Sequence, residues 1–425
     1  MNKDKNDFSQ GSVVKNIMSL AVPMTLAQLI NVLYNIVDRI YIGRIPQDST
    51  LSLTGIGLSL PIITMVIAFA NLFGMGGAPL CSIERGRGRI EEAEKIMGNS
   101  FTMMVISGIL LTAFGLIFKR PMLYLFGASD STWPFADAYI TIYLFGSLFV
   151  MVGLGMNSFI NSQGFGKIGM MTVLLGAVSN IILDPIFIFV LDMGVKGAAI
   201  ATVLSQMASC IYVLVFLFGK MPLVRITFGG YRWNTMKQVL LVGLSPFLII
   251  ASDSLLIIVM NMIIRKFSNP ADGDMLLTCN TIVQSFMLLI TMPLGGITGG
   301  TQTVMGYNYG AGRPDRIRKA EKHVLLLSVA FTTVMFIIAQ AGPGYFVRIF
   351  TREMSYVQVT VWAIRIFTLC IIPLAVEYTV VDGFTGMGIA KVAISLSMFR
   401  KSVYFLGMIL LPRYFGVEAV FYAEP

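Results

Sequence analysis

The chain has 425 residues, of which 56% are hydrophobic and only 12% are charged, and its mean hydropathy is +0.78. This composition excludes a soluble globular protein and indicates a polytopic membrane protein. The formal charge of +9 does not require a nucleic acid partner, because basic loops are the expected counterpart of an anionic cytoplasmic leaflet. We therefore expect contact with a lipid bilayer and none with nucleic acid.

Eleven apolar runs are each long enough to cross a bilayer, for which about 20 helical residues suffice. They cover approximately residues 16–43, 51–83, 96–118, 138–162, 168–191, 196–218, 238–264, 275–307, 323–346, 356–382 and 391–411. The first run is too long for a signal-peptide core and follows no small-residue cleavage site, so we expect it to remain in the mature protein. The expected fold is all-α and integral to the membrane.

The distribution of Lys and Arg predicts the orientation. With the amino terminus in the cytoplasm, the inner segments hold 18 of these residues and the outer loops hold nine. The positive-inside rule favours this arrangement. We therefore expect a multi-pass protein of the plasma membrane with a cytoplasmic amino terminus.

The first apolar run carries polar residues on a single stripe. Gln28, Asn31, Asn35 and Asp38 are spaced by 3, 4 and 3 positions, which places all four on one helical face. A charge inside a membrane helix costs about 2.5 to 3.5 kcal/mol on insertion scales, so the stripe should face a bundle interior or a water-filled cavity. The alternative is that Asp38 only anchors the helix end, paired with Arg39.

The chain contains two copies of one unit. Pro23 corresponds to Pro246 at an offset of 223, and the Gly164-Phe165-Gly166 turn corresponds to Gly386-Met387-Gly388 at an offset of 222. Each copy begins on the inner side and has an even number of spans, so the copies should be related by an axis along the membrane normal. Under this offset Asp38 corresponds to Asn261, so the acid occurs in one copy only.

The duplication defines the expected organisation as two six-helix bundles. The predicted parts are an amino-terminal lobe at 1–218, a cytoplasmic linker at 219–237 and a carboxy-terminal lobe at 238–425. The offset places the start of a twelfth helix near Glu418, so we expect that helix to be an incomplete stub.

A second acid of the first copy lies at a depth similar to that of Asp38. Asp184 follows Asn180 by one helical turn in the fifth run. Asp38 and Asp184 lie near the outer ends of their runs, so one site could contain both. Carboxylates with neighbouring Asn side chains can exchange a proton or bind sodium, and the residues alone do not distinguish these ions.

The second copy carries acids at other positions. Asp253 lies in the middle of the seventh run without an obvious partner, which suits a proton relay or a cationic ligand. Glu377 could form a structural ion pair with Arg400, and Asp382 lies near the inner end of the same run as Glu377.

Glycine pairs in the eighth run allow two interpretations. Gly295 with Gly299 and Gly296 with Gly300 have GxxxG spacing, which favours close helix packing. They could also mark a bend that rearranges during transport. The four cysteines show no CxxC spacing and the chain has one histidine, so we expect buried thiols and no metal or redox centre.

Several of these segments together resemble the multidrug and toxic compound extrusion (MATE) transporters. The resemblance extends from about Val13 to the end of the chain and rests on the duplicated six-span plan and on ordered motifs. The motifs are Pro23…Gln28…Asn35-Ile36-Val37-Asp38…Gly43, Gln163-Gly164-Phe165-Gly166-Lys167 and Asn180…Asp184-Pro185.

The resemblance implies two lobes around a central cleft that exports lipophilic, mostly cationic compounds in exchange for protons or sodium. It implies a cation-coupling site in the first lobe and substrate-binding acids in the second. The coupling site would comprise Asp38, Asn180 and Asp184, with the stripe residues Gln28, Asn31 and Asn35. The substrate-binding acids would be Asp253, Glu377 and Asp382. We expect small-molecule drugs as substrates, no cofactor, no resident metal other than sodium at Asp38 and Asp184, and a monomer.

Two other functions were considered. A flippase for lipid-linked oligosaccharides or lipid II has the same gross plan, but it should need deep cations for a pyrophosphate, and the candidates are Arg365, Arg400 and Lys401. A membrane-embedded enzyme lacks support, because no GxSxG motif and no paired histidines occur. ATP-driven transport lacks support as well, because there is no GxxxxGK[ST] motif.

Overall fold

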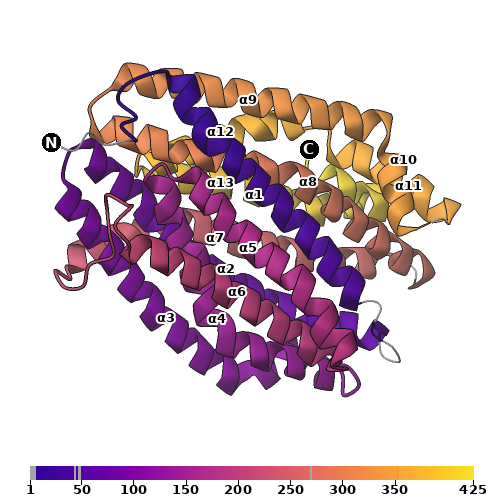
Figure 1. The fold of residues 1–425 in the computed structure, drawn as a ribbon. Helices are drawn as coiled ribbons and strands as arrows, with labels where there is room; N and C mark the ends of the chain where they lie inside the picture. Colours follow the sequence, from indigo (N-terminus) through magenta and orange to yellow (C-terminus); the bar gives the residue numbers. More distant parts are fainter. Residues whose placement is uncertain (1–5, 43–44, 46–48, 269, 352) are drawn as a thin grey trace.

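The computed structural model describes the chain except residues 1–5, 43–44, 46–48, 269 and 352, and every regular element in the described part is a helix (Figure 1). The elements are α1 Val13–Ile42, α2 Ser49–Gly86, α3 Ile90–Leu125, α4 Trp133–Ser162, α5 Gly166–Pro185, η1 Ile186–Val190, α6 Gly194–Phe218, α7 Trp233–Phe267, α8 Pro270–Gly310, α9 Pro314–Ala341, α10 Pro343–Phe350, α11 Met354–Phe367, α12 Ile371–Gly386, α13 Ala390–Phe415 and η2 Val417–Tyr422.

The helices agree with the predicted membrane spans. Within the described residues, ten helices are long and apolar enough to cross a bilayer, and the bent pair α11 and α12 makes an eleventh span. The expected all-α membrane fold is confirmed. Residues 233–237, which were assigned to the linker, instead form the first turn of α7. The residues at which a twelfth helix was expected form the short η2.

One predicted span is broken, and the sequence contains the reason. The run 356–382 bends by 48° between α11 and α12. Pro373 lies in the first turn of α12, where its missing N–H and its ring prevent a regular helix from continuing through this point. The Gln340 amide on α9 donates a hydrogen bond of 2.9 Å to the Arg365 carbonyl, which satisfies one backbone group near the break.

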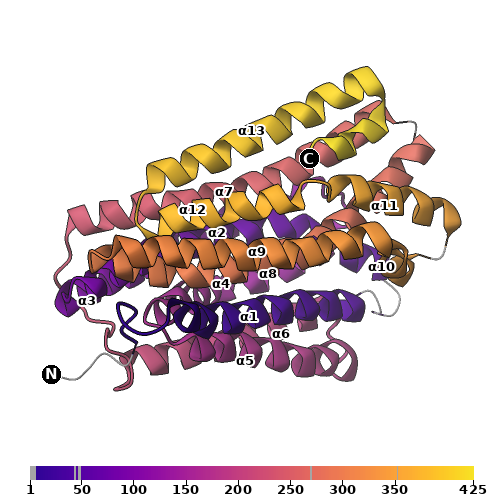
Figure 2. The ribbon, with the colours of Figure 1, turned by 90° about the horizontal axis from the view of Figure 1, so that it is seen from above.

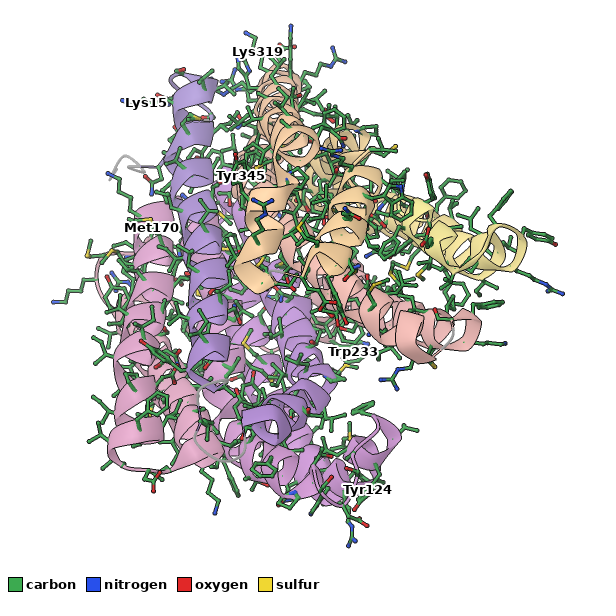
Figure 3. All side chains as sticks on the ribbon, turned by 90° about the vertical axis from the view of Figure 1, so that its right-hand side faces the viewer. Lys15, Tyr124, Met170, Trp233, Lys319 and Tyr345 are labelled. Carbon is green, nitrogen blue, oxygen red and sulfur yellow. The ribbon has the colours of Figure 1, made fainter. Side chains whose placement is uncertain are left out.

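The helices form two groups in the ribbon views. Helices α2 to α6 lie on one side, and α8 to α13 lie on the other (Figures 1 and 2). Figure 3 shows the same two groups with their side chains. The largest clusters of buried apolar side chains follow this division, since one falls within residues 42–239 and the other within 256–423. Helices α1 and α2 pack against α8, and α2 also packs against α7, so these four elements join the groups.

The two groups are joined tightly at the end of the bundle that carries the amino terminus. There, the Ser82 hydroxyl on α2 donates a hydrogen bond of 2.8 Å to the Thr303 carbonyl on α8. A Cβ atom built on Gly86 would lie 2.0 Å from the Tyr307 carbonyl, and one built on Gly310 would lie 2.0 Å from the Ile83 carbonyl. These two glycines therefore allow a backbone approach that no other residue would permit.

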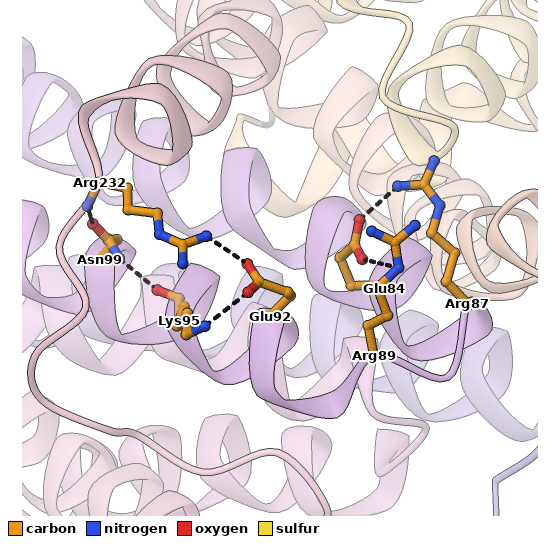
Figure 4. A network of polar contacts seen from close by, with 7 residues as sticks. All are labelled: Glu84, Arg87, Arg89, Glu92, Lys95, Asn99 and Arg232. Carbon is orange, nitrogen blue, oxygen red and sulfur yellow. Dashed lines mark hydrogen bonds and ion pairs between the residues drawn. The ribbon is translucent and has the colours of Figure 1, made fainter.

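The connection between α6 and α7 also lies at this end, against the first group. The backbone N–H of Val224 donates to the Gln163 side chain at 3.0 Å. Arg232 contacts Glu92 and Asn99 on α3, at 3.4 Å and 3.3 Å, within the polar network of Figure 4. The connection therefore belongs structurally to the first group of helices.

The segment before α1 crosses the same end and touches both groups. The Asn6 amide donates to the Gln163 carbonyl at 2.8 Å, on the side of α4. The Phe8 ring packs edge-on against Tyr307 with a centroid distance of 5.7 Å. The Phe8 carbonyl accepts hydrogen bonds from Asn308 at 3.1 Å and from the Arg316 guanidinium at 2.9 Å. Residues 6–12, which we call the amino-terminal strap, thus bridge the two groups.

Arg316 holds the strap, and its removal should loosen this end. Its guanidinium also donates to the carbonyls of Gln10 and Gly11, at 2.9 Å and 3.0 Å. We expect Arg316→Ala to favour opening by about 1 kcal/mol, a net value for such hydrogen bonds. The buried thiol of Cys81 should then react with a soluble maleimide about fivefold faster. The measurement uses purified protein in which Cys210, Cys279 and Cys370 are replaced by Ser.

Arg318→Ala is the matched control, because Arg318 is exposed on the same helix and removes the same charge. Its Cys81 labelling rate should equal that of the parent protein. Equal labelling rates in Arg316→Ala and the parent would contradict the role assigned to the strap.

Candidate functional site

A cavity of about 780 Å³ lies between the two groups of helices, and both contribute to its wall. Among the predicted site residues, those that line it are Gln28, Asn31, Asn35, Asp38, Asn180, Glu377 and Asp382. Along α1 the lining extends from Gln28 to Ile42, which is the half of the helix distant from the amino terminus. The cavity therefore begins beyond the tightly joined end and extends toward the opposite end.

The polar stripe of α1 faces this cavity, as its spacing predicted. All four stripe residues belong to the lining. The Asn35 amide donates to the Asn31 carbonyl at 2.7 Å, so it satisfies part of its hydrogen bonding within its own helix. Asp38 lies at the far end of the stripe, near the cavity-lining side chains of Tyr34 and Tyr139. The alternative pairing with Arg39 involves a side chain outside the described residues.

Asp38 and Asp184 come together, although they lie on different helices. Asp184 on α5 is fully buried, and the Asn180 amide donates to its Oδ1 atom at 3.1 Å. The carboxyl groups of Asp38 and Asp184 lie within hydrogen-bonding reach of each other. Two carboxylates at such a separation repel strongly unless a proton or a cation lies between them.

Buried oxygen atoms remain available beside this acid pair. Oδ2 of Asp184 and Oδ1 of Asn180 are buried and accept no hydrogen bond from any described residue. Carboxylate and amide oxygens are suitable ligands for a hard cation, and a carboxylate oxygen can equally take a proton. No group of three or more His, Cys, Asp or Glu side chains in the described part of the chain could form a metal centre.

The acids of the second half have different surroundings. Glu377 forms the expected ion pair with Arg400, at 2.7 Å. The same guanidinium contacts Glu424 at 2.9 Å, a partner that the sequence analysis missed. Glu424 follows η2, which packs against α13 and α7, and its contact with Arg400 depends on that fold-back. Arg400 is therefore held between two carboxylates.

The expectation that Asp253 lacks a partner is wrong. Lys401 on α13 forms an ion pair with Asp253 on α7. The two residues are 148 positions apart in sequence, and the packing of α7 against α13 brings them together. Sequence spacing gave no signal for the pair except that a lysine inside a membrane helix needs some partner.

Asp382 is held by neutral groups. The Gln302 amide on α8 donates to its Oδ1 atom at 2.9 Å, and the Thr298 hydroxyl is a second hydrogen-bond partner. Gln302 and Thr298 were not among the predicted site residues. Unlike Glu377 and Asp253, Asp382 forms no ion pair in the described part of the chain.

The two glycine pairs of α8 have different roles. Cβ atoms built on Gly296 and Gly300 would lie 2.7 Å from Thr25 Cα and 3.0 Å from Ala21 Cα, so this pair allows α1 to pack closely. Gly295 and Gly299 instead line the cavity. The cysteines conform to expectation in part, because three are buried and Cys370 is half-buried.

Comparisons with known proteins agree with this architecture. The chain is similar to the protein named "Multidrug export protein MepA" of Staphylococcus haemolyticus, with 23% identity over 98% of this chain and 91% of that protein. The protein of that name in Staphylococcus saprophyticus is 24% identical over 89% of this chain and 82% of the relative.

A solved structure has the same fold. It is described as the outward-facing conformation of a multidrug resistance MATE family transporter of the MOP superfamily. The TM-score is 0.92 at 22% identity, with 100% of this chain and 94% of that chain covered. The family model MatE matches residues 23–186 and 249–410, one stretch on each side of the connection between α6 and α7. With most of its length matched in this way, the chain belongs to the MatE family of membrane transporters.

Proposed function

We propose that the protein is a secondary-active antiporter that exports lipophilic, often cationic compounds in exchange for protons or sodium. The observation that carries this proposal is the single cavity whose wall joins a buried acid pair in the first half to acids in the second half. The names of the MepA relatives, which describe multidrug export, support the same function.

In the proposed mechanism, the Asp38 and Asp184 pair with Asn180 binds the coupling ion. Neutralising the pair removes the repulsion between the two carboxylates, so a proton or sodium stabilises the arrangement that holds them together. A bound ion drives transport only through different affinities for the two conformations. Gln28, Asn31 and Asn35 would supply polar groups on the path between this site and the substrate.

The second half would bind the substrate. Asp382 presents a carboxylate to the cavity with neutral partners only, whereas Glu377 and Asp253 are each paired with a cation. A carboxylate in a cleft of low dielectric attracts cationic compounds more strongly than one in bulk water. We expect the protein to act as a monomer in the plasma membrane.

The flippase alternative is less well supported. Arg400 and Lys401 line the cavity, which suits a pyrophosphate, but both are already paired with carboxylates. A pyrophosphate would have to separate these buried pairs and leave their carboxylates without cations. Drug-dependent growth without a defect in envelope synthesis would favour the antiporter.

We expect Asp38→Asn to reduce gradient-driven export at least tenfold while the protein still folds and binds substrate. The amide cannot take up or release a proton, and it binds sodium more weakly than a carboxylate does. The measurement is export by purified protein in liposomes, with pH and sodium gradients imposed separately. Adding Asp184→Asn should cost little more, because the two acids would act as a unit.

The control is Asp130→Asn, which removes an exposed carboxylate outside the cavity and should leave export unchanged. Export at the wild-type rate by Asp38→Asn would remove the α1 stripe from the mechanism. An absence of export by the wild-type protein under either gradient would refute the antiporter itself.

The proposed orientation places the amino terminus and the start of α7 in the cytoplasm, because the inner segments carry the excess of Lys and Arg. Single cysteines at Ser12 and Thr235 in a cysteine-free background should react with an impermeant reagent only after the cells are opened. A cysteine at Ser131, between α3 and α4, should react in intact cells. The reverse labelling pattern would mean that the cavity extends toward the cytoplasm.

A further inference from the structure

The ion pair between Lys401 and Asp253 differs from the other charged contacts of the cavity wall in its exposure. The Lys401 side chain is 7% exposed, whereas that of Asp253 is 53% exposed. Lys401 lines the cavity together with Ser397 and Arg400, which lie on the same helix. The ammonium group thus approaches Asp253 from the protein side, and much of the carboxylate remains open to another group.

The position of Asp253 on its helix directs this open side toward the cavity. Pro246, Ile249 and Ile250 of α7 line the cavity, and Asp253 follows them at spacings of seven, four and three residues. Residues at these spacings share one face of a helix. Asp253 therefore continues the α7 face that borders the cavity.

The second ion-pair cluster of this wall offers no comparable opening. Arg400 is held by Glu377 and Glu424, whose side chains are 21% and 13% exposed. A ligand cation would have to separate a guanidinium from two largely covered carboxylates, which is costly. At Asp253 it would have to replace a single ammonium group at a half-exposed carboxylate.

We propose that Lys401 is a resident counter-ion that competes with the cationic group of the substrate for Asp253, and so determines specificity. This inference rests on the proposed export of cationic compounds. A substrate cation gains Asp253 only by displacing the lysine ammonium, which discriminates against weakly interacting cations. Lys401 also prevents Asp253 from presenting an uncompensated negative charge when the cavity holds no substrate.

Removing the lysine charge should strengthen the binding of cations only. We expect Lys401→Met to bind the lipophilic cation tetraphenylphosphonium about tenfold more tightly than the wild type, which corresponds to about 1.4 kcal/mol. The affinity for triphenylphosphine oxide, a neutral compound of related shape, should change less than about twofold. Both affinities are measured by equilibrium dialysis with the purified full-length chain.

Adding Asp253→Asn to Lys401→Met tests whether the gain depends on this carboxylate. The double variant leaves neither a buried unpaired ammonium nor a free carboxylate, so its fold should be retained. We expect the tenfold gain to disappear in it. Persistence of the gain would mean that Lys401 acts through another acid and would overturn the inference.

Lys391→Met is the matched control. Lys391 is exposed near the start of α13, ten residues from Lys401, so the change removes the same charge from the same helix. Its affinity for the cation should equal that of the wild type. An equal gain in both Met variants would indicate a long-range charge effect and would contradict the proposed competition.

The outcomes separate this inference from the proposed function. If the wild type binds the cation and exports cationic compounds but Lys401→Met binds no more tightly, only the role of Lys401 is refuted. If neither the wild type nor any variant binds the cation, both the role of Lys401 and the proposed export of cations are refuted.

Discussion

The cost of placing a charge within a bilayer constrains this structure more than any other interaction. Lipid offers neither water nor counter-ions, so each acid of the membrane helices must face a cavity, accept hydrogen bonds or pair with a cation. The protein uses all three arrangements. Asp38 faces the cavity, Asp382 is held by Gln302, and Asp253 and Glu377 pair with Lys401 and Arg400. The charges thereby define the wall of the cavity.

The two halves solve this problem differently despite their common sequence pattern. The first half brings Asp38 and Asp184 together without a printed ion pair, so the charge of the pair must be neutralised from outside the protein, by a proton or a small cation. The second half supplies its own cations on α13. This difference is a physical reason to assign ion coupling to the first half and substrate recognition to the second.

The sequence predicted the helices and the α1 stripe well, because hydrophobic length and helical periodicity are local properties. The bend at 368–370 was recognisable only in retrospect from Pro373. The partners of the second-half acids could not be predicted, since Lys401 reaches Asp253 across 148 positions and Glu424 reaches Arg400 only through the fold-back of η2. Such contacts depend on how helices pack, which the spacing along one helix does not contain.

The contacts at the amino-terminal end set the energetic requirement for alternating access. Gly86 and Gly310 bring the backbones of α2 and α8 together, and the strap adds hydrogen bonds from Arg316 and Asn308. Opening this end exposes those polar groups to water, which replaces most of their hydrogen bonds at a net cost of about 0.5 to 1.5 kcal/mol each. Closing the opposite end would recover free energy by burying the apolar part of the cavity wall. The conformational balance therefore lies within reach of one bound ion, since a differential affinity of about 5.5 kcal/mol already converts a 1:99 population into 99:1.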